Sequence, residues 1–217
     1  MMSQIEGFIL VGGASRRMGE PKYKLEIGGM TFLERAASAL TAMTTGQIIV
    51  VGDIDDSYLK VKLFDGEGRE LRKIPDIISS ECGGDHTGCG ALIGLFTALT
   101  YAKTRWIAVL ACDLPFVTGD LMTRIANCRS KDLEAIVPIQ PDSRVQPLCA
   151  VYQREGCLPI VEKMITDGDL KMQRLISLVR TRFVKFDEIA DLDGSSNFFL
   201  NVNRPDDYKA ALKILPD

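Results

Sequence analysis

The sequence predicts an α/β fold in which helices cover both faces of a mostly parallel β-sheet. Short, almost continuously apolar runs alternate with longer runs of helical periodicity along the first half of the chain. Strands that consist of unbroken apolar runs are typical of parallel sheets, which are buried on both faces between helices. The chain has 217 residues, 46% of them hydrophobic, and can therefore bury one sizeable core. Repeats and linkers are absent from the sequence, so we predict a single domain over residues 1–217.

The elements of the first half follow from periodicity and from one helix-start signal. Phe32, Ala36 and Leu40 fall on a single face of a helix. Thr31 and Glu34 form a capping box, which fixes where this helix begins. We predict strands over 8–11, 47–52, 72–76 and 106–113, and helices over 31–43 and 90–103.

The second half is less regular. A helical stretch over 156–179 is interrupted near 167–169, and Pro205 occupies the first turn of a final helix, a position that proline favours. We predict strands over 134–139, 146–153, 182–188 and 198–203.

Charge and composition argue against several kinds of partner. The formal net charge is −3, so we expect no nucleic-acid partner. The N-terminus lacks a cationic flank before a long apolar region, and apolar runs such as 107–112 are too short to span a bilayer. We therefore expect a cytoplasmic protein with no membrane contact, and a monomer. The six scattered cysteines are expected to be free thiols.

A glycine or an aspartate lies at the carboxyl end of each of four predicted strands. These residues are Gly12, Gly52, Asp76 and Asp113. The carboxyl ends of parallel strands meet at one edge of the sheet, where α/β proteins bind their ligands. This edge is therefore the predicted site.

A glycine-rich, basic loop follows the first strand. Glycines there let backbone N–H groups approach phosphate oxygens, and Arg16, Arg17, Lys22 and Lys24 fall within nine positions. The loop lacks the spacing of the dinucleotide fingerprint and of the P-loop. A phosphate-binding loop of another kind is favoured over an exposed loop with solvated charges.

The stretch LVGGASRRMGEPKYKLEIGGMTFLER, over 10–35, resembles the opening of the molybdenum cofactor nucleotidyltransferases, and most of all their guanylyltransferase branch. Segments 87–99, 110–117 and 199–208 resemble three further motifs of this family, in the same order. The resemblance implies a Rossmann-like nucleotide-diphospho-sugar-transferase fold. It also implies that the half up to about residue 113 binds the nucleotide and that the half from about 114 faces the acceptor.

The sequence departs from the family pattern at three positions. Val11 stands for the usual alanine, Ala91 for proline and Arg204 for threonine. None of these changes removes a charged or metal-binding group. The property that the changes at Val11 and Ala91 would affect is the positioning of the nucleotide base.

The implied reaction is attack by the terminal phosphate of molybdopterin on the α-phosphorus of GTP, with release of pyrophosphate. Phosphoryl-type transfer needs positioning and charge neutralisation more than covalent help from the protein. The substrates that the resemblance implies are GTP and the molybdenum cofactor (molybdopterin). Other proteins of cofactor biosynthesis or molybdoenzyme maturation are further candidate partners.

The resemblance also implies roles for individual residues. Arg17 and Lys22 would neutralise the leaving pyrophosphate, and Asp113 would hold Mg²⁺, which needs only one or two carboxylates beside phosphate oxygens. Asn203, and more weakly Asn201, would lie near the metal or the phosphates. Nucleotide-binding positions would be Leu10, Val11, Gly12, Gly13, Ser15, Lys22, Gly52, Asp76, Gly90 and Asp113, with Asp76 accepting from guanine.

Each polar candidate also has a structural interpretation. Asp113 precedes Leu114-Pro115 and could simply form a turn, and Asn203 could cap the helix that starts at Pro205. Lys24 is interpreted as a surface charge. The resemblance favours the functional interpretation for Asp113.

Cys82, His86 and Cys89, with Asp85 between them, form a second cluster. The spacing C-x₃-H-x₂-C provides no clear fourth zinc ligand. A glycine-rich loop is favoured over a zinc site, and metal analysis of the purified protein decides between them.

Three alternatives to guanylyl transfer stay open. The chain could be a molybdenum cofactor cytidylyltransferase, although these relatives tend to have T-A-A-G where it has Leu10 to Gly13. It could act on sugar-nucleotide or isoprenoid precursors, whose enzymes have similar loops. It could also be a non-catalytic nucleotide-binding adaptor, against which Lys22, Asp113 and Asn203 argue.

Overall fold

The computed structural model describes residues 4–12, 20–44, 46–55, 71–77 and 90–215. Its strands are β1 (Ile5–Leu10), β2 (Glu26–Ile27), β3 (Met30–Thr31), β4 (Ile48–Val51), β5 (Arg72–Ile74), β6 (Trp106–Ala111), β7 (Ala135–Pro138), β8 (Cys149–Gln153) and β9 (Thr181–Val184). Its α-helices are α1 (Phe32–Thr41), α3 (Ala91–Tyr101), α4 (Gly119–Asn127), α5 (Arg154–Thr166), α6 (Met172–Leu178) and α7 (Pro205–Ile214).

Seven strands form one sheet in the order β5-β4-β1-β6-β8-β7-β9, and β2 pairs with β3 in a separate small hairpin. Neighbouring strands from β5 to β6 are parallel, β7 is parallel to β9, and β8 is antiparallel to both of its neighbours. The predicted mostly parallel, mixed sheet is confirmed. The chain runs outward from β1 on one side through β4 and on the other through β6, so β1 and β6 flank a topological switch point.

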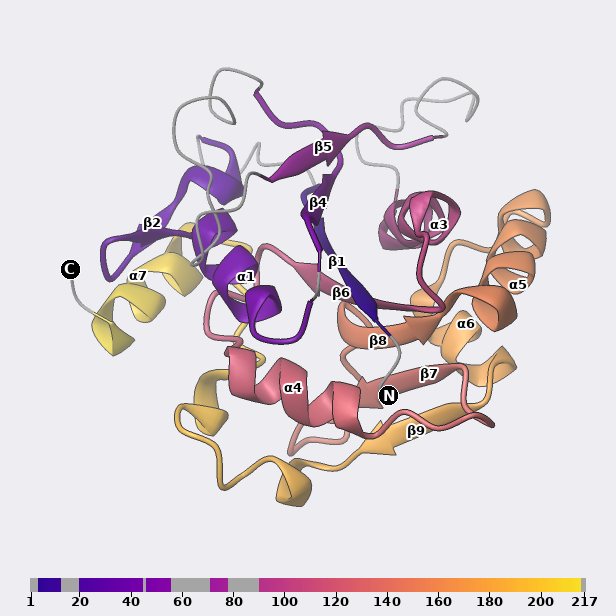
Figure 1. The fold of residues 1–217 in the computed structure, drawn as a ribbon. Helices are drawn as coiled ribbons and strands as arrows, with labels where there is room; N and C mark the ends of the chain where they lie inside the picture. The colour runs from indigo at the N-terminus through magenta and orange to yellow at the C-terminus, as the bar shows by residue number, and fades with distance from the viewer. Residues whose placement is uncertain (1–3, 13–19, 45, 56–70, 78–89, 216–217) are drawn as a thin grey trace.

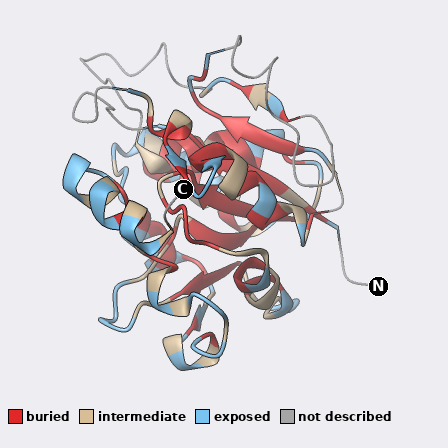
Figure 2. Ribbon diagram, turned by 90° about the vertical axis from the view of Figure 1, so that its left-hand side faces the viewer, coloured by how far each residue is buried: buried red, intermediate tan, exposed pale blue. Residues whose placement is uncertain are grey.

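Helices cover both faces of this sheet, as predicted (Figure 1). Helices α1 and α4 pack on one face, and α3, α5 and α6 on the other. Adjacent strand residues alternate between the two layers: Ile9 and Leu110 contact the first, whereas Phe8 and Val109 contact the second. The central strands of the sheet are buried and the outer faces of the helices are exposed (Figure 2). A sheet covered in this way presents its carboxyl edge, rather than a face, to ligands.

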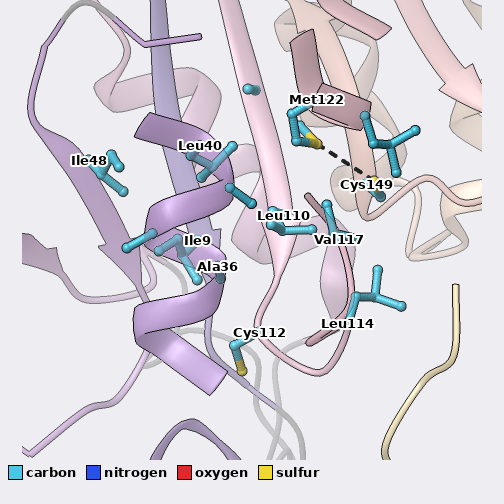
Figure 3. Close-up of a cluster of buried hydrophobic side chains, with 14 of the residues drawn as sticks. Ile9, Ala36, Leu40, Ile48, Leu110, Cys112, Leu114, Val117, Met122 and Cys149 are labelled. Atoms are coloured by element: carbon cyan, nitrogen blue, oxygen red, sulfur yellow. Dashed lines mark hydrogen bonds between the residues drawn. The ribbon is translucent and has the colours of Figure 1, made fainter. Parts of the chain in front are cut away.

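The core under α1 and α4 continues to the carboxyl end of β6. Ile9, Ala36 and Leu110 pack together there, and Cys112 lies at the end of the same cluster (Figure 3). The predicted capping box at the start of α1 is confirmed, because Thr31 Oγ1 accepts from the N–H of Glu34 and the Glu34 carboxylate accepts from the N–H of Thr31. This cap fixes α1 against the sheet.

The predicted strand over 198–203 is wrong. A 3₁₀ turn over Ser195–Asn197 leads into irregular backbone, because the N–H of Leu200 turns back to the carbonyl of Asn197. Phe198 and Val202 are nevertheless fully buried. The apolar residues that suggested a strand therefore anchor a strap, defined here as residues 198–204, to the core.

Two other boundaries also differ from prediction. The strand expected over 182–188 ends as β9 at Val184, and a 3₁₀ turn over Phe186–Glu188 follows. The helix expected over 156–179 is divided into α5 and α6 at the predicted break, where Gly168 has φ +76°. Neither α4 nor the β2-β3 hairpin was predicted. None of the helices in the described part of the chain combines the length and apolarity needed to cross a bilayer.

Candidate functional site

A cavity of about 240 Å³ opens at the carboxyl edge of the sheet, at the switch point between β1 and β6. Its walls come from the ends of β1, β4 and β6, from the segment after β5 and from the start of α3. The volume is below the ~300–1,000 Å³ of typical small-molecule sites. A larger ligand would extend out of it past Asp113. The lining residues are Leu10, Val11, Gly12, Val51, Asp76, Gly90, Ala91, Gly94, Ala111, Cys112, Asp113 and Leu148.

A cluster of polar side chains, Lys22, Asp113 and Asn203, adjoins this cavity. Lys22 Nζ lies 3.3 Å from Asp113 Oδ2 and donates to Asn203 Oδ1. The side chains of Lys22 and Asp113 are only 10% and 19% exposed. The pair is therefore largely shielded from solvent, where charge interactions are stronger than in bulk water.

The strap positions the side-chain amide of Asn203 within this cluster. The N–H of Val202 donates to the carbonyl of Asp113 at 3.0 Å, and Asn203 Nδ2 donates to Asn201 Oδ1. Asp207 Oδ2 accepts from the backbone N–H of Asn203 and of Arg204, at 3.0 and 2.8 Å. Arg204, not Asn203, is the N-cap residue of α7, so the Asn203 side chain is available to Lys22.

Asp113 has the features that a hard cation needs. Its Oδ1 atom is buried and lacks a hydrogen-bond partner among the described residues. The nearby amide oxygens of Asn201 and Asn203 are further oxygen donors of the kind that Mg²⁺ prefers. No group of three or more His, Cys, Asp and Glu side chains in the described ranges is arranged to hold a metal ion, so a cation here would depend on phosphate oxygens and water for its other ligands. The residues present fit Mg²⁺.

Asp76 supplies a second unsatisfied carboxylate oxygen to the same cavity. Its Oδ1 is buried without a hydrogen-bond partner in the described parts of the chain, and burial raises the pKa of the carboxyl group above its ordinary value of 3.8. The next residue is held in place, because the N–H of Ile77 donates to the buried Thr97 hydroxyl at 3.1 Å. Asp76 is thus a fixed acceptor for a ligand that carries hydrogen-bond donors.

The first turn of α3 forms another wall of the cavity. Gly90 is the N-cap residue and has no side chain with which to cap the free N–H groups of the helix. A Cβ at Gly94 would come within 3.3 Å of Leu10 Cδ1, so glycine allows the close contact between α3 and β1. The helix therefore presents its positive N-terminal end to the cavity.

Cys112 lies between Asp113 and the core and lines the same cavity. Burial, assisted by the neighbouring Asp113 carboxylate and opposed by Lys22, raises the pKa of its thiol to about 12. The thiol is therefore neutral at physiological pH and is not an activated nucleophile.

The structure brings most of the predicted residues to one place. Leu10, Val11, Gly12, Asp76, Gly90 and Asp113 line the cavity, and Lys22 and Asn203 adjoin it. Gly13, Ser15, Arg17, Cys82, Asp85, His86 and Cys89 lie outside the described residues. Sequence reasoning missed Leu148, which reaches the cavity because its carbonyl accepts from the N–H of Ala111 at 2.8 Å. Its position depends on the antiparallel pairing of β8 with β6, which no local pattern specifies.

Gly52 does not line the cavity; it holds two strand ends together behind it. Its N–H donates to the carbonyl of Ile74 at 3.1 Å, while the N–H of Val11 donates to the carbonyl of Val51 at 2.9 Å. Its φ of +118° is in a region that L-residues with a side chain rarely adopt. Gly52 therefore affects the shape of the cavity wall without lining it.

The raised pKa of Asp76 gives a testable pH dependence of stability. The folded state binds this proton more tightly than the unfolded state, so the free energy of unfolding falls as pH rises from about 3.8 through the raised pKa. We expect Asp76→Asn to remove this part of the pH dependence. Urea unfolding of both proteins between pH 4 and pH 7 measures it, and parallel curves would contradict the assignment.

Comparison with known proteins identifies the family. Residues 7–182 match the family described as "MobA-like NTP transferase domain". A Pelotomaculum thermopropionicum protein with the name "Probable molybdenum cofactor guanylyltransferase" is 32% identical over 210 residues, which cover 97% of this chain and 93% of the relative.

Two solved structures show the same fold. One is molybdopterin-guanine dinucleotide biosynthesis protein A from Archaeoglobus fulgidus, with a TM-score of 0.70, 23% identity, and coverage of 97% of this chain and 98% of that one. The other is 4-diphosphocytidyl-2C-methyl-D-erythritol synthase from Anaerococcus prevotii, with a TM-score of 0.68, 13% identity and 99% coverage of both chains. With these matches, the chain belongs to the MobA-like NTP transferase family and is a nucleotidyltransferase.

Proposed function

We propose that this protein transfers GMP from GTP to the molybdenum cofactor and releases pyrophosphate. The observation that carries the proposal is the shielded contact of Lys22 with Asp113 and Asn203 beside a cavity that contains a fixed carboxylate acceptor, Asp76. The relatives named above supply the acceptor, because their names refer to molybdenum cofactor or molybdopterin. The donor base follows from the chemistry of Asp76.

The reaction forms one P–O bond and breaks another. A terminal phosphate oxygen of the acceptor attacks the α-phosphorus of GTP, and the bond from that phosphorus to the bridging oxygen of the β-phosphate breaks. Negative charge moves onto the departing pyrophosphate, where a fixed cation lowers the barrier. Lys22 is the cation that the described residues place beside Asp113.

Asp113 and Asn203 hold the ammonium group of Lys22 beside the cavity. An ammonium group has three N–H donors, so Lys22 can donate to phosphate oxygens while it keeps its contact with Asp113. The N-terminal end of α3, which also lines the cavity, adds a positive partial charge. Arg17 remains a further proposed contributor from the loop that precedes Lys22.

Asp113, with Asn203 and more weakly Asn201, would hold Mg²⁺. The ion, when bound, would neutralise phosphate charge and orient the triphosphate. Asp113 Oδ1 is available for such a role because it has no protein partner among the described residues. Asp113 Oδ2 would at the same time keep Lys22 in position.

Asp76 explains a preference for guanine. The N1–H and 2-amino groups of guanine are adjacent donors, and a carboxylate can accept from both. Adenine and cytosine present no such pair of donors to a carboxylate. A buried oxygen without a partner is costly, and a guanine ligand would satisfy it.

The test is pyrophosphate release with Mg²⁺, molybdopterin and each of the four nucleoside triphosphates in turn. We expect turnover with GTP to exceed that with the other three by at least about 10-fold, the usual effect of hydrogen bonds to a charged group. Equal rates with all bases would overturn the guanine assignment, and a higher rate with CTP would indicate cytidylyl transfer. Absence of turnover with every triphosphate, despite nucleotide binding, would favour the adaptor alternative.

A variant of Asp76 sharpens this test. Asp76→Asn replaces one acceptor by an N–H₂ donor, so we expect it to weaken GTP use by about 10- to 100-fold. Xanthosine triphosphate has a carbonyl in place of the 2-amino group and should become the better substrate of the variant. A loss of both activities, or unchanged preference for GTP, would show that Asp76 does not contact the base.

A further inference from the structure

Arg35 is a half-buried arginine on α1 and is not one of the residues that line the cavity. Its Nε donates to the carbonyl of Pro115 at 2.7 Å, and its Nη1 donates to the carbonyl of Ile27 at 3.1 Å. Among the described residues no carboxylate pairs with it, and burial lowers the pKa of its guanidinium group. Partial burial of a guanidinium charge is costly, and the hydrogen-bond partners that the described residues give Arg35 are carbonyl groups. We therefore expect Arg35 to have a specific role.

The two carbonyls belong to the segments that carry the two charged residues of the site. Pro115 lies two positions after Asp113, and Ile27 lies in β2, five positions after Lys22. The two segments meet a second time where Lys22 Nζ lies 3.3 Å from Asp113 Oδ2. Arg35 thus ties together, from the side of α1, the same segments that the charged pair joins at the cavity.

Helix α1, which carries Arg35, is held in place at its first turn. Arg35 follows the capping box of Thr31 and Glu34, and the N–H of Phe32 donates to the carbonyl of Leu25 at 2.8 Å. Helix α1 is therefore fixed to the Lys22 segment at its own first turn. The guanidinium group is planar and its two N–H bonds point in fixed directions. The position of α1 therefore determines the position of the Pro115 carbonyl.

We propose that Arg35 is a positioning residue that sets the separation of Lys22 and Asp113. It touches no substrate and acts through the Ile27 and Pro115 carbonyls. The inference rests on the proposed function for its effect on catalysis, but the separation of the two side chains can be measured without turnover. Arginine suits this role because its Nε and Nη1 atoms donate to the two carbonyls in fixed directions, whereas the donors of lysine rotate about a single nitrogen and methionine has no donor.

The experiment compares Arg35→Lys and Arg35→Met with Arg154→Met. Arg154 is a matched control, because it is also half-buried and its Nε donates to a backbone carbonyl, that of Leu99, at 2.9 Å. We expect Arg35→Met to lower kcat about 10- to 100-fold with KM for GTP within about 3-fold, and Arg35→Lys to fall between it and the parent. Arg154→Met should retain kcat within about 2-fold. Urea unfolding at the assay temperature verifies that each variant is folded.

Two further measurements separate positioning from general stability. Added methylguanidinium should restore part of the kcat of Arg35→Met and none of any loss in Arg154→Met. Crystal structures should show Lys22 Nζ more than 4 Å from Asp113 Oδ2 in Arg35→Met and unchanged in Arg154→Met.

The outcomes distinguish this inference from the proposed function. The first outcome requires that the parent protein turns over GTP. If folded Arg35→Met then keeps both the parent kcat and the parent distance between Lys22 Nζ and Asp113 Oδ2, the positioning role is wrong. If Arg35→Met does not fold, Arg35→Lys provides the same test. An equal loss of kcat in Arg154→Met would also overturn it. If no triphosphate is turned over by the parent but the separation widens in Arg35→Met, the proposed function fails and the positioning role stands.

Discussion

Asp113→Asn is expected to abolish nucleotidyl transfer while the protein stays folded. The substitution removes a carboxylate whose Oδ1 is buried without a partner among the described residues, and whose Oδ2 holds Lys22 at 3.3 Å. An amide keeps the volume and one acceptor for Lys22, so the free energy of unfolding should change by no more than about 1–2 kcal/mol. The charge that would hold a cation against the triphosphate is lost, and we expect kcat to fall by about 10³-fold or more.

Pyrophosphate release at saturating GTP and Mg²⁺ measures this effect, and urea unfolding measures stability. Asp191→Asn is the matched control, because Asp191 pairs with Arg124 at 3.0 Å on an exposed surface outside the cavity lining. Its kcat should equal that of the parent within about 2-fold. Turnover by folded Asp113→Asn within 10-fold of the parent would refute the role assigned to Asp113.

Gly52→Ala is expected to have the largest effect on stability. A Cβ at this position would lie 1.9 Å from the carbonyl oxygen of Val11, and the backbone φ is +118°. The oxygen belongs to backbone at the end of β1, which cannot move without disturbing the cavity wall. We expect the free energy of unfolding to fall by about 3 kcal/mol or more, since backbone strain and a steric clash combine.

Gly29→Ala is the control that separates conformation from contact. Gly29 also has a positive φ, +69°, but nothing lies within 4 Å of a Cβ placed there. Gly29→Ala should lower the free energy of unfolding by about 1 kcal/mol, which is the usual penalty of a left-handed conformation alone. Urea denaturation of the two variants gives the difference, and equal costs would show that the β1 end accommodates the extra methyl group. Failure of Gly52→Ala alone to accumulate as folded protein agrees with the expectation.

The layered fold could be predicted because its signals are local. The apolar runs of β1, β4 and β6 and the capping box of Thr31 are each contained within a few residues, and the structure confirms them. Helix α4 had a usable signal that was not used: Thr118 caps its start, and Leu121, Met122 and Ile125 repeat with helical spacing. The β2-β3 hairpin has only two residues per strand, too few for any periodicity.

The strap shows where local reasoning fails. Its apolar residues satisfy a strand pattern, but burial was achieved by packing against the core rather than by pairing in the sheet. Separate sequence motifs predicted Lys22, Asp113 and Asn203 as site residues. Their contact depends on backbone paths that bring together residues 91 and 181 positions apart. The roles assigned to them in transfer remain predictions until the variants are assayed.

The strap also determines the order in which the site is completed during synthesis. Every residue of the cavity wall except Leu148 precedes residue 114, so a growing chain contains the cavity wall early. Asn203 emerges from the ribosome long afterwards, and the backbone bond from Val202 to Asp113 can form only then. A nascent chain can thus contain the cavity wall before it has the amide that engages Lys22. The cluster of Lys22, Asp113 and Asn203 is complete only after synthesis has passed residue 203.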